Sequence, residues 1–132
     1  MTLNTNAKIL IVDDYKTMLR VIRNLLGQIG FKDVDEATDG TMALELMKNK
    51  QYDLIISDWN MEPMTGLDLL KNVRTAAGPM QKVPFIMVTA ENKAENIIAA
   101  KQAGVNNYIV KPFSAETLKT KIDAVMGARA YA

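Results

Sequence analysis

Four apolar runs of this 132-residue chain end in side chains that carry a charge or a hydroxyl group. Asp13 and Asp14 follow the run KILIV, and Asp58 follows DLIIS. Thr89 follows PFIMV, and Lys111 stands after YIV, directly before a proline. Each residue alone has an ordinary structural explanation, such as an acidic cap before a helix. Together they supply three carboxylates, one hydroxyl and one ammonium at equivalent points of the chain, as a reactive site would need.

Three aspartates brought together need a compensating positive charge, because carboxylates at short range cannot all stay ionised. Hard oxygen ligands around an open position suit a small divalent cation such as Mg²⁺. A carboxylate that attacks phosphorus forms an aspartyl phosphate, an established form of covalent catalysis. Lys111 would add a second positive charge, and Thr89 would donate a hydrogen bond to a phosphoryl oxygen. These residue types therefore predict magnesium-assisted phosphoryl chemistry on an aspartate.

The apolar runs alternate with segments of helical period. Dense runs rich in β-branched residues are typical of strands buried on both faces. The expected strands are Lys8–Val12, Val34–Ala37, Asp53–Ser57, Pro84–Val88 and Tyr108–Val110. Apolar residues spaced three and four apart predict helices between the strands. Four of the expected helices are Lys16–Ile29, Met42–Lys48, Leu67–Arg74 and Ala94–Ala103, with Gly30 and Gly104 after two of them. Leu118, Ile122, Val125 and Met126 mark a last helix, with Ser114 as its N-cap.

Five strands that alternate with five helices predict an α/β fold, in which right-handed crossovers cover both faces of a parallel sheet. The C-terminal ends of all strands then lie along one edge, where ligand sites form at the reversal of strand order. With the strand order 2-1-3-4-5, the first and third strands are neighbours and their aspartates converge. We expect a single domain over residues 1–132, with its core at about 8–126.

The composition excludes several kinds of site. The chain has no cysteine, which excludes disulfides, thiolate metal ligands and thiol catalysis. It has no histidine, so a phosphoryl donor must be another protein or a small molecule. A net charge of +1 gives no electrostatic reason to bind nucleic acid or an anionic membrane. No signal segment or membrane-spanning run is visible, so we expect a cytoplasmic protein.

Four short motifs at these spacings resemble those of response-regulator receiver domains, most of all the single-domain regulators of chemotaxis. The motifs are Asp13-Asp14, Ser57-Asp58-Trp59-Asn60-Met61, Val88-Thr89-Ala90-Glu91 and Lys111-Pro112-Phe113. The resemblance extends over essentially the whole chain. It implies a flavodoxin-like fold of five parallel strands in the order 2-1-3-4-5 and five helices.

The resemblance also implies the roles of the site residues. Asp58 would accept the phosphoryl group, and Lys111 would contact it. Mg²⁺ would be held through Asp13, Asp14, Asp58 and the backbone carbonyl of Asn60. Family members often have a cis bond before the matching proline, so we expect the Lys111–Pro112 bond to be cis.

Activation in such a protein would move two residues together. Thr89 would be drawn toward the phosphoryl group, and Tyr108 would turn inward from a solvent-exposed position. Ile97, Tyr108 and Lys121 are the candidate contacts of an output partner. The implied partners are a histidine kinase of the chemotaxis type, a flagellar motor switch protein and a phosphatase, and the protein itself is expected to be a monomer. A phosphate sink or a relay intermediate would need the same site, and both stay open here.

One departure from the family pattern stands beside the site. Glu62 occupies the position four residues after the acceptor, where the family usually has the proline that here follows as Pro63. This change puts the lifetime of the phosphoryl group in question and brings an extra carboxylate toward the expected metal.

Two other classes of protein compete with the receiver interpretation. Magnesium-dependent aspartyl-phosphate phosphatases of the haloacid-dehalogenase type usually carry a second aspartate two residues after the nucleophile, where this chain has Asn60. An amide cannot exchange a proton in that role, and turnover of substrate would separate the two. A flavodoxin-like FMN carrier would want a hydroxyl-rich segment after the first strand, where this chain has two aspartates. The preferred interpretation is therefore a phosphoryl-accepting switch that is not a turnover enzyme.

Overall fold

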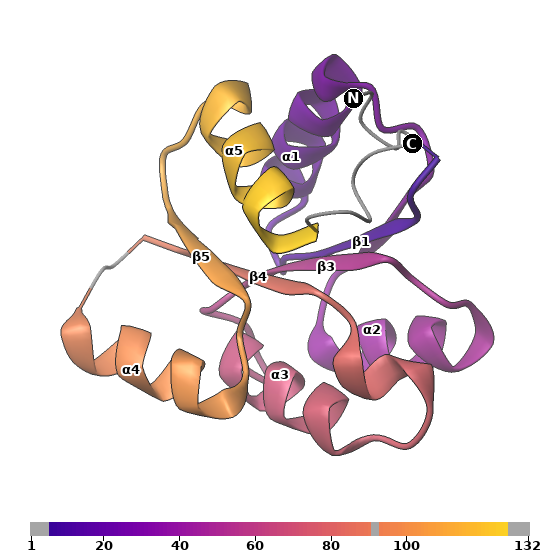
Figure 1. The fold of residues 1–132 in the computed structure, drawn as a ribbon, viewed down its shortest axis with the longest axis vertical. Coiled ribbons are helices and arrows are strands. Elements are labelled where there is room, and N and C mark those ends of the chain that lie inside the picture. The colour runs from indigo at the N-terminus through magenta and orange to yellow at the C-terminus, as the bar shows by residue number, and fades with distance from the viewer. Residues whose placement is uncertain (1–5, 91–92, 127–132) are drawn as a thin grey trace.

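The computed structural model describes residues 6–90 and 93–126, drawn as a ribbon in Figure 1. Its five strands form one parallel sheet in the predicted order β2-β1-β3-β4-β5. The strands are β1 (Ile9–Val12), β2 (Val34–Ala37), β3 (Leu54–Asp58), β4 (Phe85–Thr89) and β5 (Asn107–Val110). The helices are α1 (Lys16–Ile29), α2 (Gly40–Asn49), α3 (Gly66–Thr75), α4 (Ala94–Ala103) and α5 (Ala115–Met126), with a short 3₁₀ helix η1 (Pro79–Lys82) that the sequence analysis did not predict. Glu91 and the ends of the expected domain lie outside the described residues.

Two strands lie one residue further along than predicted, and the difference concerns reactive side chains. β3 ends in Asp58 instead of Ser57, and β4 ends in Thr89 instead of Val88. Both residues pair with the neighbouring strand, Asp58 with Val88 and Thr89 with Val110. The phosphoryl-acceptor candidate and the threonine are therefore held by the sheet itself, not by a loop that follows it.

Two helices begin earlier than the apolar period predicted, because polar residues cap them. α2 begins two residues before Met42, and the Asp39 carboxylate accepts a hydrogen bond of 2.7 Å from the Met42 amide. α3 begins at Gly66 behind a capping box made by Thr65 and Asp68. Apolar spacing alone does not see such caps, so it underestimated both helices.

Other predicted boundaries agree more closely. The ranges of α1, α4 and β2 are as predicted, while β1 begins at Ile9 and β5 at Asn107. Gly30 and Gly104 follow their helices with positive φ angles of 118° and 98°, as C-terminal glycine caps do. The Ser114 hydroxyl accepts a hydrogen bond of 3.2 Å from the Thr117 amide, so its predicted role as an N-cap is confirmed.

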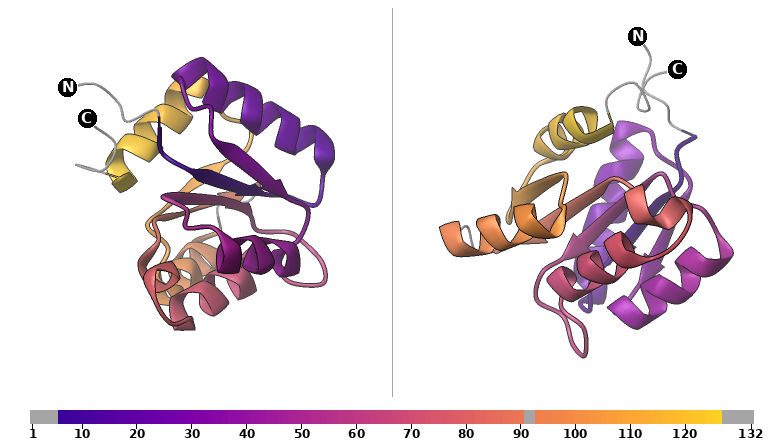
Figure 2. Two further views of the ribbon diagram at one scale, coloured as in Figure 1. Left: turned by 90° about the vertical axis from the view of Figure 1, so that its right-hand side faces the viewer. Right: turned by 60° about the horizontal axis from the view of Figure 1, so that its bottom comes forward.

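The helices lie in two layers, with α1 and α5 on one face of the sheet and α2, α3 and α4 on the other (Figures 1 and 2). Each face has its own apolar core, and β1 shows how the two are divided. Ile9 and Ile11 belong to the core beneath α1 and α5, whereas Leu10 and Val12 belong to the opposite one. Because both faces are filled, the strand ends are the places left for chemistry.

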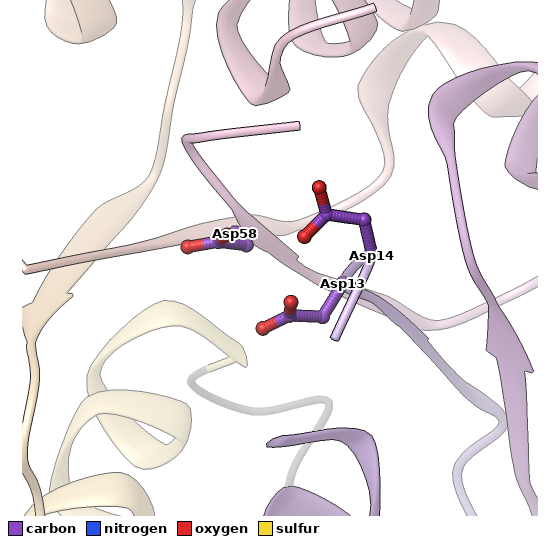
Figure 3. Close-up of side chains that lie close together, drawn as sticks. All are labelled: Asp13, Asp14 and Asp58. Atoms are coloured by element: carbon purple, nitrogen blue, oxygen red, sulfur yellow. The ribbon is translucent and has the colours of Figure 1, made fainter. Parts of the chain in front are cut away.

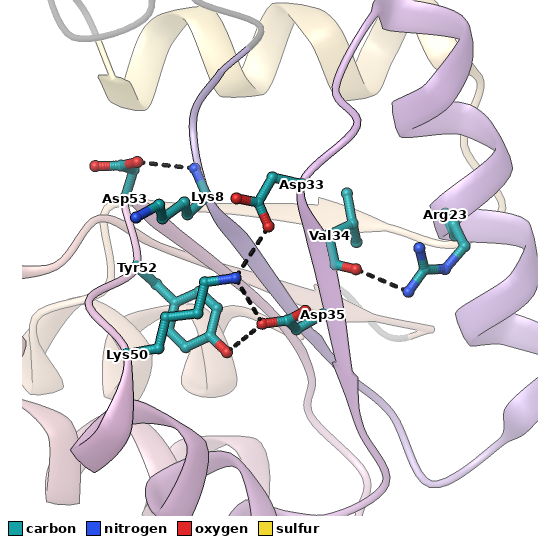
Figure 4. A network of polar contacts seen from close by, with 8 residues as sticks. All are labelled: Lys8, Arg23, Asp33, Val34, Asp35, Lys50, Tyr52 and Asp53. Atoms are coloured by element: carbon teal, nitrogen blue, oxygen red, sulfur yellow. Dashed lines mark hydrogen bonds and ion pairs between the residues drawn. The ribbon is translucent and has the colours of Figure 1, made fainter.

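A charged cluster ties β2 to the connection between α2 and β3, near the ends where these strands begin (Figure 4). The Lys50 ammonium lies 3.0 Å from a carboxylate oxygen of Asp33 and 3.0 Å from one of Asp35. The buried Tyr52 hydroxyl donates a 2.6 Å hydrogen bond to Asp35. This hydrogen bond, with the lysine, holds the pKa of Asp35 below its ordinary value. The cluster lies where β2 and β3 begin, whereas Asp13 and Asp58 stand where β1 and β3 end, so its role is to hold the sheet.

Arg74 near the end of α3 braces the opposite part of the sheet. Its guanidinium donates hydrogen bonds of 2.9 Å to the Gly104 carbonyl, 2.7 Å to the Val83 carbonyl and 2.8 Å to the Asn106 side chain. The same Asn106 oxygen accepts a 2.8 Å hydrogen bond from the Phe85 amide. One side chain thus fixes α3, the start of β4 and the turn that leads into β5.

Candidate functional site

Three aspartates meet at the C-terminal edge of the sheet (Figure 3). Asp13 and Asp14 follow β1, and Asp58 ends β3. Each offers a carboxylate oxygen, and these oxygens lie within 4.8 Å of one another. Asp13 is 1% exposed and Asp58 is 7% exposed, whereas Asp14 faces solvent. The sequence prediction that these three side chains converge is confirmed.

Strand pairing produces this convergence. β1 lies between β2 and β3, and its last residue, Val12, is paired with Ser57 of β3. The Asp13 amide continues the ladder by donating to the Ala37 carbonyl of β2 at 3.1 Å. The carboxylates at the ends of β1 and β3 therefore emerge side by side.

The Asp13 carboxylate is buried among charges of both signs. One of its oxygens accepts a 2.9 Å hydrogen bond from the Tyr15 amide, and the other lies 3.4 Å from the Lys111 ammonium. Burial is the main cause that raises the pKa of Asp13 above its ordinary value. The Tyr15 amide opposes this rise, the Asp58 carboxylate adds to it, and Lys111 also opposes it. It is therefore unfavourable for all the carboxylates of the site to be ionised at once unless a cation binds between them.

Lys111 brings the one ammonium group that the sequence analysis assigned to this site. Its Nζ lies 3.0 Å from Asp58 Oδ1, and its side chain is 24% exposed. The Lys111 amide donates a 2.7 Å hydrogen bond to the Thr89 carbonyl, which anchors the residue where β5 ends beside β4. The Lys111–Pro112 bond is cis, as predicted, and the Glu62–Pro63 bond is also cis, which was not predicted.

The charges of the site leave room for a metal ion. The three carboxylates and the Lys111 ammonium together carry a net negative charge when all are ionised. A single divalent cation would bring this net charge close to zero. Oxygen ligands on a partly exposed edge are the ligands that Mg²⁺ prefers. Asn60 is exposed in the turn after β3, near these aspartates in sequence. Glu62 is exposed and is not one of the three clustered carboxylates, so an extra carboxylate near the metal stays a prediction.

Thr89 and Tyr108 line a common small cavity beside the site. Thr89 is 6% exposed. The cavity has a volume of about 10 Å³, and Trp59 and Ile97 also contribute to its walls. Tyr108 is half-buried and packs against the core under α3 and α4, so its predicted solvent-exposed starting position is not what the structure shows.

The three predicted partner contacts lie on neighbouring elements, on α4, β5 and α5. Ile97 is half-buried and faces the cavity, whereas the next residue, Ile98, is 55% exposed. Lys121 is half-buried beside Tyr108. The weak apolar period of α4 does not show which of the two adjacent isoleucines faces outward, and the role of Ile97 as a partner contact stays a prediction.

The chain is similar to known proteins over nearly its whole length. Residues 9–123 match the family model described as the response regulator receiver domain. The chain is 54% identical over 123 residues to the chemotaxis protein CheY-3 of Vibrio cholerae, an alignment that covers 93% of this chain and 94% of that protein. It is 52% identical over 118 residues to the chemotaxis protein CheY of Pseudomonas aeruginosa, covering 89% and 94%.

Solved structures agree with these relatives. Chemotaxis protein CheY4 of Vibrio cholerae superposes with a TM-score of 0.84 and 36% identity, covering 91% of this chain and 98% of that one. The receiver domain of the sensor histidine kinase PA1611 of Pseudomonas aeruginosa superposes with a TM-score of 0.83 and 28% identity, covering 92% and 98%. That structure is described with a magnesium ion coordinated in its active-site cleft. In the described part of the present chain, no helix is long and apolar enough to cross a membrane, and localisation stays a prediction.

Proposed function

This chain belongs to the response regulator receiver domain family, and from that premise we propose that it is a phosphorylation-activated regulator of chemotaxis whose acceptor is Asp58. The observation that carries the proposal is the placement of Asp58. Its carboxylate ends a fully buried central strand, lies among two other aspartates, and is 3.0 Å from the Lys111 ammonium. The proposed phosphoryl donor is a histidine kinase, as membership of the receiver-domain family implies.

The proposed reaction is a transfer between two side chains. A carboxylate oxygen of Asp58 attacks the phosphorus of the kinase phosphohistidine, a P–O bond forms, and the P–N bond breaks. The electron pair of the broken bond stays on the imidazole, which takes up a proton. Burial keeps Asp58 in a single orientation, so little freedom is lost as the acyl phosphate forms.

Lys111 would stabilise the new dianionic group. Its ammonium already lies within ion-pair distance of Asp58 and Asp13, so it needs only a small shift to contact a phosphoryl oxygen. Thr89 ends the adjacent strand, and its hydroxyl would donate a hydrogen bond to a phosphoryl oxygen. Both contacts strengthen as negative charge arrives at Asp58.

Mg²⁺ fits the carboxylates and would be held through Asp13, Asp14, Asp58 and the backbone carbonyl of Asn60. When bound, Mg²⁺ would supply positive charge that offsets the repulsion of the acceptor carboxylate for an incoming phosphoryl group. The chain's own contribution is to hold two carboxylates buried and close together before the metal binds. The Tyr15 amide fixes the orientation of Asp13 for this purpose.

The output would be a protein contact made by α4, β5 and α5. A flagellar motor switch protein is the proposed partner, since two similar proteins are chemotaxis proteins. A phosphatase would end the signal, and a phosphate sink or relay step would use the same chemistry. We propose a monomer that keeps its phosphoryl group and does not turn over substrate. Asn60 supports this, because it offers no proton for the hydrolytic step of an aspartyl-phosphate phosphatase.

The acceptor is tested by phosphorylation with phosphoramidate and Mg²⁺, followed by intact mass measurement. Wild-type protein should gain one phosphoryl group that hydroxylamine removes, as it does from an acyl phosphate. Asp58→Asn should gain none, because the amide is a poor nucleophile. Asp53→Asn is the matched control, since Asp53 is exposed and bonds the Lys8 amide outside the site. Normal labelling of Asp58→Asn at the native site would refute the assignment.

A further inference from the structure

The side chain of Lys121 lies against the ring of Tyr108. Its Nζ is 5.5 Å from the centre of that ring, within the range of a cation–π contact. The same Nζ lies 3.5 Å from the Asn107 side-chain oxygen, which itself accepts a 2.8 Å hydrogen bond from the Tyr108 amide. Among the ion pairs of residues 6–90 and 93–126, none involves Lys121. The ring and the amide oxygen are therefore what hold this ammonium.

This contact reaches around the edge of the sheet. Ile109 of β5 is buried in the core under α1 and α5, whereas its neighbour Tyr108 packs against the core of the opposite face. Lys121 comes from α5, on the face away from Tyr108, and β5 is the outermost strand on that side (Figure 1). The ammonium must therefore pass the free edge of β5 to meet the ring.

A second lysine and tyrosine in the chain show the same contact in a fixed setting. Lys50 Nζ is also 5.5 Å from the centre of the Tyr52 ring. There, two aspartates hold the ammonium and one of them holds the tyrosine hydroxyl. Within residues 6–90 and 93–126, the Tyr108 hydroxyl makes no hydrogen bond like that of Tyr52, and the Tyr108 amide donates to Asn107. Among the described residues, the Tyr108 contact therefore lacks both the carboxylate partners of the ammonium and the hydrogen bond of the hydroxyl, so it is a contact that can open.

The space toward Thr89, into which the Tyr108 ring would turn on activation, is almost fully occupied by neighbouring side chains. The cavity between Tyr108 and Thr89 measures about 10 Å³, which is close to the space of a single water probe and far too small for a phenol ring. The ring can enter only if the neighbouring side chains move aside. The outward and inward positions of the ring thus belong to two distinct conformations of the protein. A weak contact such as that with Lys121 can shift the equilibrium between them.

We propose that Lys121 is a positioning residue that holds the Tyr108 ring at the edge of β5 and so restrains the unphosphorylated protein from its active packing. This inference rests on the proposed function, because it assigns the regulation of that same site. Loss of the ammonium would raise the population of the inward ring position, relative to the outward one, by about two- to fivefold. This factor corresponds to the free energy of a surface cation–π contact. Phosphorylation would become easier by no more than the same factor, since the coupling is reciprocal.

The test uses Lys121→Met, which keeps a long unbranched side chain and removes its charge. Lys121→Arg is the conservative variant and should preserve the contact, because a guanidinium also binds an aromatic face. Lys119→Met is the matched control on the same helix, where Lys119 pairs with Asp123 at 3.1 Å. Three-bond NMR couplings of Tyr108 in donor-free protein report its χ1 populations. The initial rate of phosphorylation by phosphoramidate is then measured for all four proteins, with no partner present.

Lys121→Met should shift the Tyr108 rotamer populations two- to fivefold and raise the phosphorylation rate, while the other two variants match wild type. Unchanged Tyr108 couplings in folded Lys121→Met would overturn the proposal, and so would an equal shift in Lys119→Met. A rotamer shift with no change in rate would overturn the regulatory role. Because the couplings are read without a donor, failure of Asp58 as the acceptor would be seen separately from failure of Lys121.

Discussion

At the scale of single residues, the chemistry depends on charges that the fold holds close together. Asp13 and Asp58 are nearly excluded from solvent, and the Lys111 ammonium faces both of them with an opposite charge. Their mutual repulsion is part of what raises the pKa of Asp13, after burial itself. A cation near these carboxylates lowers their electrostatic repulsion. A bound metal ion would act in this way on the aspartates, and Lys111 would do the same for a phosphoryl oxygen.

Trp59 gives a direct measure of metal binding, because it follows Asp58 and is half-buried against the neighbouring core. We expect Mg²⁺ to change its emission in a saturable way and EDTA to reverse the change. Asp14→Asn should weaken the apparent Mg²⁺ affinity by about tenfold or more, since even outer-shell partners of a metal are worth that much. Glu62→Gln is the control and should bind as wild type does, because Glu62 lies outside the carboxylate group. An identical response in Asp14→Asn would contradict the metal assignment.

At the scale of elements, polar side chains fix the helices and strands whose ends carry the site. Arg74 joins α3 to the starts of β4 and β5, and its pKa is lowered by burial, without a carboxylate among the causes. Its hydrogen bonds to backbone carbonyls replace the water that a buried guanidinium loses. The Lys50 and Tyr52 cluster does the same for β2, at the other side of the sheet.

Tyr52→Phe tests the second of these clusters and has a defined pH dependence. The lost hydrogen bond should cost about 1 kcal/mol of unfolding free energy near neutral pH, because Asp35 is partly exposed. The bond lowers the pKa of Asp35 in the folded state below 3.8. Its contribution is therefore complete above that value and is lost as the pH falls through the lowered pKa.

Urea denaturation of wild type and Tyr52→Phe, from neutral pH down to about pH 3, checks this expectation. The difference between the two proteins should shrink toward acid pH. Asp35→Asn is the control, and in that background the pH dependence of the Tyr52→Phe effect should disappear. A cost that stays constant with pH would mean that the hydroxyl contributes by packing and not through the Asp35 carboxylate.

At the scale of the whole molecule, the periodic parts of the sequence predicted the fold and the positions of its reactive residues. Asp13, Asp58 and Lys111 were found because parallel strands bring their ends to one edge. The contacts of Arg74 and Lys121 were missed, because they join residues from different elements through side-chain geometry that leaves no period in the sequence. The half-buried state of Tyr108 was missed for the same reason.

The whole molecule must also convert the local event at Asp58 into a changed surface on α4, β5 and α5. Thr89 lies between the two, since it ends β4 and shares a wall of the small cavity with Tyr108. A phosphoryl group that draws the Thr89 hydroxyl toward Asp58 would open the space that the ring requires. The two packings need to differ by only a few kcal/mol for such a switch to work.

Thr89→Ala should separate charging of the site from signalling. Beryllofluoride, a phosphoryl mimic, should raise the affinity of the wild-type protein for a flagellar motor switch peptide by about five- to 150-fold, the usual range of allosteric coupling. Thr89→Ala should still bind Mg²⁺ and beryllofluoride, as Trp59 emission would report, but its enhancement should fall several-fold. Isothermal titration of the peptide with and without beryllofluoride measures both factors.

By reciprocity, the peptide should tighten beryllofluoride binding by the same factor in each protein. Equal enhancement in wild type and Thr89→Ala would exclude the threonine as the link to Tyr108 and would leave Asp58 as the acceptor.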